Sequence, residues 1–205
     1  MDLRLHVLVD PQAVSVEAAA AFVQEVAAGG ATVVQLRGKQ ATTRELLALG
    51  RALREATRRQ GLWLWVNDRL DVALAVAADG VHMGQEDMDL ETVRRLAPQL
   101  AVGLSVGDQS ELNQALQLRP DYIGVGPVYA TASKPDAGAP LGVEGFRILA
   151  ARAHEGGLRV VAIGGIDGDN AGPVWRAGAD GIAVIGAVMR AQDRTEACRR
   201  LLAAR

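Results

Sequence analysis

Short apolar runs alternate with longer stretches of helical periodicity along the whole chain. Each apolar run holds four or five residues and is rich in valine, leucine and isoleucine, as is typical of strands buried on both faces. We predict strands at residues 5–9, 32–36, 63–66, 80–83, 101–104, 122–125, 160–163 and 181–185. Their shared length and composition indicate strands of one kind, connected in a regular way.

The segments between these runs carry apolar residues at the three- and four-residue spacing of amphipathic helices. In the second segment Leu46, Leu49, Leu53 and Ala56 form one stripe, and Gly61 follows where a helix C-cap belongs. We predict helices at residues 16–28, 43–59, 69–76, 90–96, 110–118, 143–155, 170–176 and 186–204. Strand and helix therefore alternate eight times.

Eight alternating strand–helix units predict an α/β fold with parallel strands and right-handed crossovers. A count of eight favours a closed (β/α)8 TIM barrel, formed as a single domain by residues 1–205 and near the lower size limit for this fold. An open, doubly wound sheet is the alternative, but it has no need of eight units.

A short sequence repeat occurs in both halves of the chain. Ala78-Asp79-Gly80-Val81 recurs as Ala179-Asp180-Gly181-Ile182, before the fourth and the eighth predicted strands. Duplication of a half-barrel and convergent turn chemistry both explain one shared tetrapeptide.

Charge and composition exclude several classes of protein. The net charge of −2 and the pI near 5.9 lack the basic footprint of a nucleic-acid-binding protein. No apolar run approaches the roughly 20 residues of a membrane span, and the start of the chain lacks signal-peptide features. Cys198 is the sole cysteine, which rules out a disulfide framework. We therefore expect a cytoplasmic enzyme or binding domain for small molecules, without nucleic-acid or membrane partners. A homo-oligomer is left open.

Polar residues gather where the predicted strands end, which is where barrel enzymes hold their chemistry. Gln35, Arg37 and Lys39 alternate along an extended segment, so their side chains point the same way. Helix N-caps explain one aspartate or serine per turn, but they do not explain this set. The asymmetry between the two ends of the strands favours an enzyme.

Lysine is rare in this chain, and its two positions are informative. Lys39 and Lys134 stand against twenty arginines, and each follows a strand-like run. A compact ammonium group suits anion binding, phosphate above all. Drift within an arginine-rich composition is the alternative explanation.

Two aspartates end neighbouring predicted strands and indicate a metal site. Asp68 and Asp87 would converge at one mouth of the barrel, and Mg²⁺ is typically held by one or two carboxylates plus substrate phosphates. Asp68 could instead cap the helix that follows it, and Glu86 is interpreted as exposed to solvent. His82, inside a strand, is interpreted as a packed core residue rather than a catalytic base.

Glycines after the last two strands match the phosphate site that is frequent in such barrels. Gly164, Gly165 and Gly186 allow backbone N–H groups to approach an anion, although glycine pairs also serve as tight turns. The hydroxyls of Thr131 and Ser133 would complete this second anion site. Residues 134–142, the longest predicted loop, are a candidate lid.

In this order, four segments of the chain resemble the thiamine-phosphate synthase family. They are Gln35-Leu36-Arg37-x-Lys39, Asn67-Asp68, Gly80-Val81-His82-x-Gly84-Gln85-Glu86-Asp87 and Gly126-Pro127-x-Tyr129-x-Thr131-x-Ser133-Lys134. The resemblance implies a transferase of thiamine biosynthesis. It would join hydroxymethylpyrimidine diphosphate to a thiazole phosphate, carboxylated or not, and release pyrophosphate.

The resemblance also implies a role for each matching residue. Gln35 would bind the aminopyrimidine ring, and Mg²⁺ would lie between Asp68 and Asp87. The pyrophosphate would contact Arg37, Lys39, Asn67, Ser105 and Lys134. The thiazole phosphate would contact Thr131, Ser133, Gly164, Ile185 and Gly186. Within the same segments, substrate contact is also assigned to Leu36, Gly38 and Ala132.

The chain departs from the family pattern at a few positions. Gly186 stands where serine is usual, which removes one hydroxyl contact and predicts weaker binding of the thiazole phosphate at most. Gly38 replaces an acidic residue, Ser133 replaces a common threonine, and the stretch after Ser105 lacks the usual histidine.

Three other functions stay open at this point. A thiazole tautomerase of similar fold uses a histidine near the start of the loop after the sixth strand, where this chain has Pro127. Phosphate-binding barrels of histidine or tryptophan biosynthesis need a carboxylate pair, which Asp68 and Asp87 could mimic. A non-catalytic ligand-binding barrel would have no need of the metal and anion positions.

Overall fold

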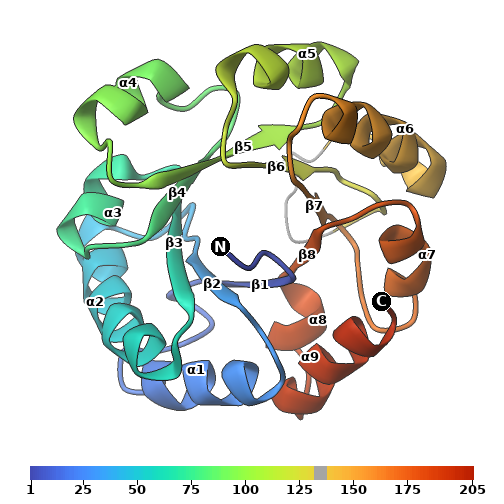
Figure 1. Ribbon diagram of the computed structural model, residues 1–205. Coiled ribbons are helices and arrows are strands. Elements are labelled where there is room, and N and C mark those ends of the chain that lie inside the picture. The colour runs from blue at the N-terminus through green and yellow to red at the C-terminus, as the bar shows by residue number, and fades with distance from the viewer. Residues whose placement is uncertain (132–137) are drawn as a thin grey trace.

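A computed structural model describes residues 1–131 and 138–205 of the chain. Eight parallel strands pair in sequence order and close into a barrel, as Figure 1 shows down the barrel axis. The strands are β1 (Leu5–Val9), β2 (Val33–Leu36), β3 (Trp63–Asn67), β4 (Gly80–Met83), β5 (Ala101–Val106), β6 (Tyr122–Val125), β7 (Val160–Ile163) and β8 (Gly181–Val184). The predicted (β/α)8 barrel is confirmed.

A ring of helices surrounds the barrel and covers the outer face of the sheet (Figure 1). The helices of the described segments are α1 (Ala19–Ala28), α2 (Thr43–Gln60), α3 (Leu70–Ala75), α4 (Leu90–Leu96), α5 (Gln109–Leu118), α6 (Gly142–Glu155), α7 (Ala171–Arg176), α8 (Gly186–Met189) and α9 (Arg194–Ala203). One prediction was wrong, because the single helix expected at 186–204 is two helices. Asp193 begins α9 as its N-cap, with its side chain accepting a hydrogen bond from the backbone N–H of Glu196.

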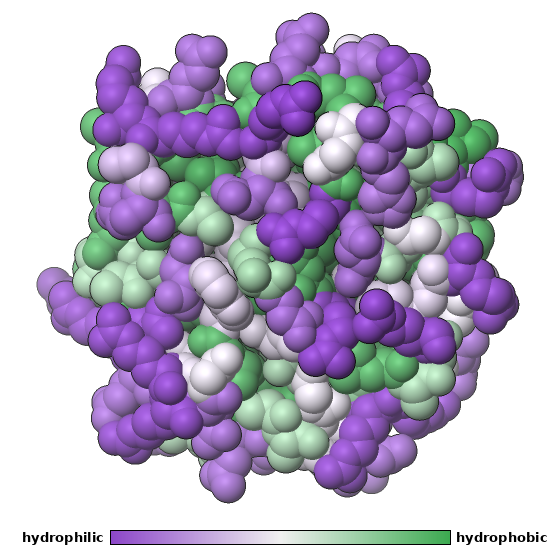
Figure 2. Space-filling view, viewed as in Figure 1, coloured by the Kyte–Doolittle hydropathy of each residue, from purple (hydrophilic) through white to green (hydrophobic). Residues whose placement is uncertain are grey.

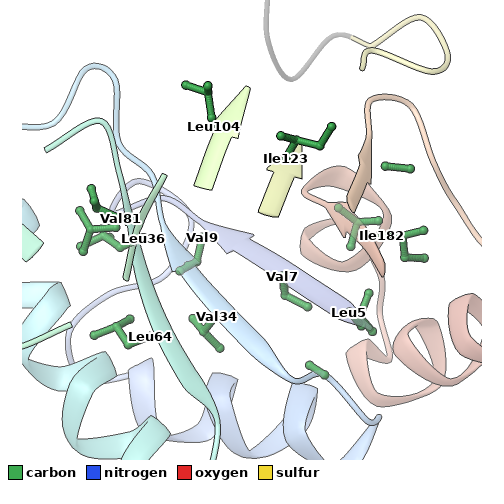
Figure 3. Close-up of a cluster of buried hydrophobic side chains, with 14 of the residues drawn as sticks. Leu5, Val7, Val9, Val34, Leu36, Leu64, Val81, Leu104, Ile123 and Ile182 are labelled. Carbon is green, nitrogen blue, oxygen red and sulfur yellow. The ribbon is translucent and has the colours of Figure 1, made fainter. Parts of the chain in front are cut away.

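Alternate strand residues point to opposite faces, so the barrel has two separate apolar layers. The larger layer lies between sheet and helices, and Figure 3 shows Val7 and Val9 of β1 beside Val34 and Leu36 of β2 within it. The smaller layer fills the barrel interior with Leu3, Leu8, Val33, Trp65, Tyr122, Val161 and Ala183. The side chains of the smaller layer form the floor beneath any site at the strand ends.

The face of the molecule seen down the barrel axis is mostly polar (Figure 2). Figure 2 shows hydrophilic residues spread over the face seen down the axis, with hydrophobic residues in small patches between them. Across residues 1–131 and 138–205, no helix has the length and apolar character needed to cross a membrane. The apolar residues of the chain are gathered mainly in the two interior layers.

The repeated tetrapeptide is part of a hydrogen-bonding arrangement that recurs at the beginning of the strands. A polar side chain just before each even-numbered strand accepts a hydrogen bond from a backbone N–H at the beginning of the preceding strand. The acceptors are Thr32 for Leu5, Asp79 for Leu64, Asp121 for Val102 and Asp180 for Val160, at 2.7 to 3.2 Å. Strand ends need such acceptors because an unpaired buried N–H is costly. The shared tetrapeptide therefore has a structural reason, whatever its origin.

Replacing Asp79 by alanine should destabilise the fold by about 3 kcal/mol. Asp79 Oδ2 lies 2.7 Å from the Leu64 nitrogen and 2.7 Å from an Arg54 guanidinium nitrogen, and only 9% of the Arg54 side chain is exposed. The variant leaves that cation buried without its partner. Chemical denaturation followed by tryptophan fluorescence measures the loss. Asp71→Ala, which breaks only an exposed pair with Arg69, should cost less than about 1 kcal/mol, and equal losses would contradict the argument.

Candidate active site

A cavity of about 960 Å³ opens at the ends of the strands. Its volume lies in the range that holds small-molecule ligands. Among the residues that line it are eleven predicted from the sequence: Gln35, Arg37, Lys39, Asn67, Asp68, Asp87, Ser105, Thr131, Gly164, Ile185 and Gly186. Residues from seven of the eight strand ends thus meet in one place, as expected for a barrel enzyme.

Two predicted substrate-binding residues do not reach this cavity. The Leu36 side chain is fully buried in the layer between sheet and helices, and Gly38 packs against Pro11, Ala41 and Leu46. Both alternate with residues that do line the cavity, so the pleat of the segment turns them away. Ala132, Ser133 and Lys134 lie outside the described residues, as do residues 135–137 of the candidate lid. Gly138 and Ala139, which also belong to the candidate lid, are described and line the cavity.

The segment that leaves β2 supplies two cations. Gln35, Arg37 and Lys39 all line the cavity, which confirms that alternating positions share a face here. The backbone N–H of Arg37 donates to the Val9 carbonyl at 2.8 Å, so the extended path continues past the end of β2. Positive charge is therefore brought to the mouth beside β3.

Asp68 and Asp87 lie within hydrogen-bonding reach of each other. Burial, and then the neighbouring Asp87, raise the pKa of Asp68 to about 6, whereas Lys39 acts in the opposite direction from 3.4 Å. Asp68 has φ of 64°, in the left-handed region that non-glycine residues rarely adopt. Such strain is often found at functional sites, and two carboxylates this close repel when both are ionised.

These features fit a divalent cation. The alternative role of Asp68 as a helix cap is not observed, because Arg69 is the N-cap of α3 and makes no side-chain cap bond. Asp87 is held in place by the backbone N–H of Gly84, at 2.7 Å from its Oδ2. No cluster of three His, Cys, Asp or Glu side chains suited to a metal occurs in the described part of the chain. Two carboxylates would therefore leave most positions of Mg²⁺ to water and substrate oxygens.

His82 has more than the packing role that the sequence indicated. It lines the cavity, with Nδ1 2.8 Å from the Tyr122 hydroxyl and Nε2 3.0 Å from Ser105 Oγ. Gly103 makes room for this arrangement, since a Cβ there would lie 2.6 Å from His82 Nδ1. Val81 faces the helix layer, so strand alternation could have shown that His82 points inward.

Tyr122 links His82 to Gln35 on the floor of the cavity. Burial raises the pKa of the Tyr122 hydroxyl above its usual value, so the group keeps its proton. The Gln35 amide acts in the opposite direction on this pKa. The Tyr122 hydroxyl lies 2.8 Å from His82 Nδ1 and Ser105 Oγ lies 3.0 Å from Nε2, so the imidazole joins the two hydroxyls. The tautomer of His82 sets which partner donates in each contact.

The glycines after β7 are required by conformation and by space. Gly164 and Gly165 have φ of 102° and 66°, and a Cβ on Gly164 would lie 2.5 Å from the Pro127 Cβ. The Gly164 carbonyl accepts a hydrogen bond from the Tyr129 N–H at 3.0 Å. The loop after β6 is thereby fixed against the end of β7, which shapes this side of the cavity.

Arg190 also lines the cavity and was missed in the sequence. It lies directly after α8, four positions beyond Gly186, and one of twenty arginines carries no signal by itself. Its position one helical turn after Gly186 places it beside the predicted phosphate site.

Comparison with known proteins supports the family resemblance of the sequence segments that line the cavity. The family model described as thiamine monophosphate synthase matches residues 5–188. A thiamine-phosphate synthase of Chloroflexus aurantiacus is 49% identical over 203 residues, covering 99% of this chain and 93% of that protein. One from Moorella thermoacetica is 50% identical over 181 residues, covering 88% and 85%.

A solved structure agrees with the sequence comparison. Thiamine phosphate pyrophosphorylase from Pyrococcus furiosus superposes with a TM-score of 0.87 at 42% identity, covering 99% of this chain and 95% of that one. The match thus extends over the complete barrel and every predicted segment. The chain therefore belongs to the thiamine monophosphate synthase family.

Proposed function

We propose that this chain condenses 4-amino-2-methyl-5-(diphosphooxymethyl)pyrimidine with a thiazole phosphate, forming thiamine phosphate and pyrophosphate. The observation that carries the proposal is the convergence of Arg37, Lys39, Asp68 and Asp87 in one cavity with Gln35. Two cations and a carboxylate pair suit a diphosphate with Mg²⁺, and an amide suits an aminopyrimidine ring. The names and coverage of the relatives point to the same reaction.

The residues on the β2 side would act on the leaving group. The bond between the pyrimidine methylene and the diphosphate oxygen breaks, and pyrophosphate leaves with the electron pair. Arg37 and Lys39 stabilise the charge that develops on that oxygen, and no general base is needed. When bound, Mg²⁺ supplies further positive charge beside the diphosphate oxygens.

The floor of the cavity would orient the pyrimidine. The Gln35 amide, which lines the cavity, would accept through its oxygen from the exocyclic amino group of the ring. The Ser105 hydroxyl, held by His82, donates to the diphosphate. Fixing both ends of one substrate aligns its methylene for attack by the thiazole nitrogen.

The β7–β8 side would bind the second substrate. Gly164, Gly186 and Thr131 line this part of the cavity and suit a phosphate group. Closing the mouth would exclude water, which competes with the thiazole nitrogen for the reactive methylene. The cytoplasmic location stays a prediction, and the oligomeric state stays open as it was in the sequence.

The direct test is pyrophosphate release. The protein is mixed with the pyrimidine diphosphate, the thiazole phosphate and Mg²⁺, and release is followed with thiamine phosphate formation by chromatography. Release should require all three components and stop with EDTA. Absence of release under every condition would refute the synthase function and favour a binding protein.

Tyr122→Phe should lower kcat/KM for the pyrimidine diphosphate about tenfold, because the variant removes the hydroxyl that positions His82 through Nδ1. KM for the thiazole phosphate should stay unchanged, since that substrate binds at β7 and β8. Initial rates at varied concentrations of each substrate measure both effects. Tyr129→Phe removes a hydroxyl bonded to the Asn170 carbonyl, outside this chain of hydrogen bonds, and serves as the matched control. Equal effects of the two variants would contradict the role of Tyr122.

A further inference from the structure

Three cationic side chains line the cavity in the part of the chain that the structure describes: Arg37, Lys39 and Arg190. The first two lie on the β2 side beside the carboxylate pair. Arg190 lies on the β8 side with Ile185, Gly186 and Ala187, where the chain passes through α8. The proposed function leaves this third cation without a task.

The position of Arg190 explains why residue 186 is glycine. A Cβ on Gly186 would lie 2.5 Å from the central guanidinium carbon of Arg190 and 2.6 Å from one of its terminal nitrogens. Gly186 is absent from the glycines with positive φ, so its backbone conformation is open to any residue. The absence of a Cβ at 186 therefore leaves the space that the guanidinium occupies, and a Cβ there would displace this flexible group.

Arg190 is also available to a ligand. In the described parts of the chain it forms no ion pair and no hydrogen bond through its side chain. The carboxylate of Asp167 lines the same cavity, but its Oδ1 accepts hydrogen bonds from the backbone N–H groups of Asp169 and Asn170 at 2.9 and 3.1 Å. A cation without a protein partner, beside the glycines of an expected anion site, suits an incoming phosphate.

We propose that Arg190 binds the phosphate of the thiazole substrate and that the lack of a side chain at Gly186 lets its guanidinium lie in this position. A planar guanidinium can donate two parallel hydrogen bonds to phosphate oxygens. It would therefore more than replace the single hydroxyl that a serine at 186 would supply. This proposal reverses the prediction from the sequence that glycine at 186 weakens binding of the thiazole phosphate. The inference rests on the proposed function and names a residue that sets affinity for the second substrate.

Two other roles for Arg190 lead to different measurements. The β8 and β2 ends are separated only by β1, so the guanidinium could instead serve the diphosphate with Arg37 and Lys39. It could also be a solvated surface arginine with no ligand. The first role changes KM for the pyrimidine diphosphate, and the second changes neither KM.

The first experiment compares Arg190→Gln with the wild type in steady-state kinetics. KM for the thiazole phosphate should rise about tenfold, as expected for loss of a charge-assisted contact, while KM for the pyrimidine diphosphate stays within twofold. Arg51→Gln, on an exposed position of α2, is the matched control and should change neither value. A rise confined to the diphosphate, or no rise at all, would overturn the proposal.

A binding measurement keeps this test separate from catalysis. Calorimetric titration of the protein alone with the thiazole phosphate, and then with inorganic phosphate, should show about tenfold weaker binding to Arg190→Gln than to wild type. If the wild type binds the thiazole phosphate and turns nothing over, the synthase function fails while the role of Arg190 stands. If binding is equal in both proteins, the role of Arg190 fails whatever the turnover.

The second experiment tests the pairing of the two positions. Gly186→Ser in the wild type should displace the guanidinium, a flexible group that can move, and raise KM for the thiazole phosphate. In an Arg190→Ala background the same serine meets no guanidinium and should lower KM about threefold through its hydroxyl. Opposite signs in the two backgrounds support a coupled pair. The same sign and size in both would show independent positions and overturn the claim about Gly186.

Discussion

Asp68→Asn should abolish most turnover and at the same time stabilise the protein in the absence of Mg²⁺. We expect turnover to fall by about 10²–10³-fold, because the variant removes one of the two carboxylates of the proposed Mg²⁺ site. Without metal the carboxylate opposes folding, since burial and Asp87 raise its pKa to about 6. The neutral asparagine removes both causes, and asparagine tolerates the φ of 64° at this position.

The pH dependence of folding stability shows whether the Asp68 carboxylate stabilises or destabilises the folded state. A carboxyl with a raised folded pKa weakens the folded state as pH rises from its usual value of 3.8 through about 6. Only 21% of the Asp68 side chain is exposed, so solvent screening leaves an effect of about 2 kcal/mol at pH 8. Near pH 4 the group is protonated and the advantage of asparagine disappears.

Thermal unfolding in EDTA at pH 4.5 and at pH 8 checks this expectation. The melting temperature of Asp68→Asn should exceed that of the wild type by several degrees at pH 8 and by little at the lower pH. Asp108→Asn is the control, because Asp108 lines the same cavity but caps α5, a task that asparagine also performs. A variant that is less stable than wild type at both pH values would contradict the account of Asp68.

Lys39→Ala should lower kcat about 100-fold and change stability little. The ammonium group lies 3.4 Å from Asp68, and 48% of its side chain is exposed, so the ion pair itself contributes at most about 1 kcal/mol. Its main effect would fall on the transition state, where charge grows on the departing pyrophosphate. An ammonium on a flexible stem can follow that charge without the fixed fork of a guanidinium.

Rapid-quench single-turnover kinetics separates chemistry from binding for Lys39. A slower chemical step with an unchanged dissociation constant for the diphosphate places the lysine in the transition state. A weaker dissociation constant with an unchanged chemical step would restrict it to binding and contradict the expectation. Lys39→Arg should restore part of the rate, and Arg44→Ala, an exposed cation of α2, should leave both quantities unchanged.

The periodic pattern was sufficient for the fold because local rules and the closed topology agree. Apolar runs of four or five residues can only be buried strands here, and eight of them with helices between close a barrel. The wrong element was the last helix, where the Asp193 cap interrupts a run of helix-forming residues. An N-cap within a helical pattern changes the boundary without changing the apolar periodicity.

The site was predicted where side-chain direction follows from strand alternation. Gln35, Arg37 and Lys39 share one face for this reason, and the same rule excludes Leu36 and Gly38 from the cavity. His82 was interpreted as a packed core residue because an isolated histidine in a strand carries no motif. Its partners, Tyr122 and Ser105, come from β6 and β5, and only closure of the barrel brings them within hydrogen-bonding distance.

The sequence by itself determined the barrel, the family and most of the residues at the strand ends, since each depends on order and spacing along the chain. The tertiary structure alone decided which side chains from distant segments contact one another. The raised pKa of Asp68 and the contacts of His82 with Tyr122 and Ser105 both join residues from different strands or turns. Distances of a few ångströms between such residues follow from packing, which periodicity does not encode.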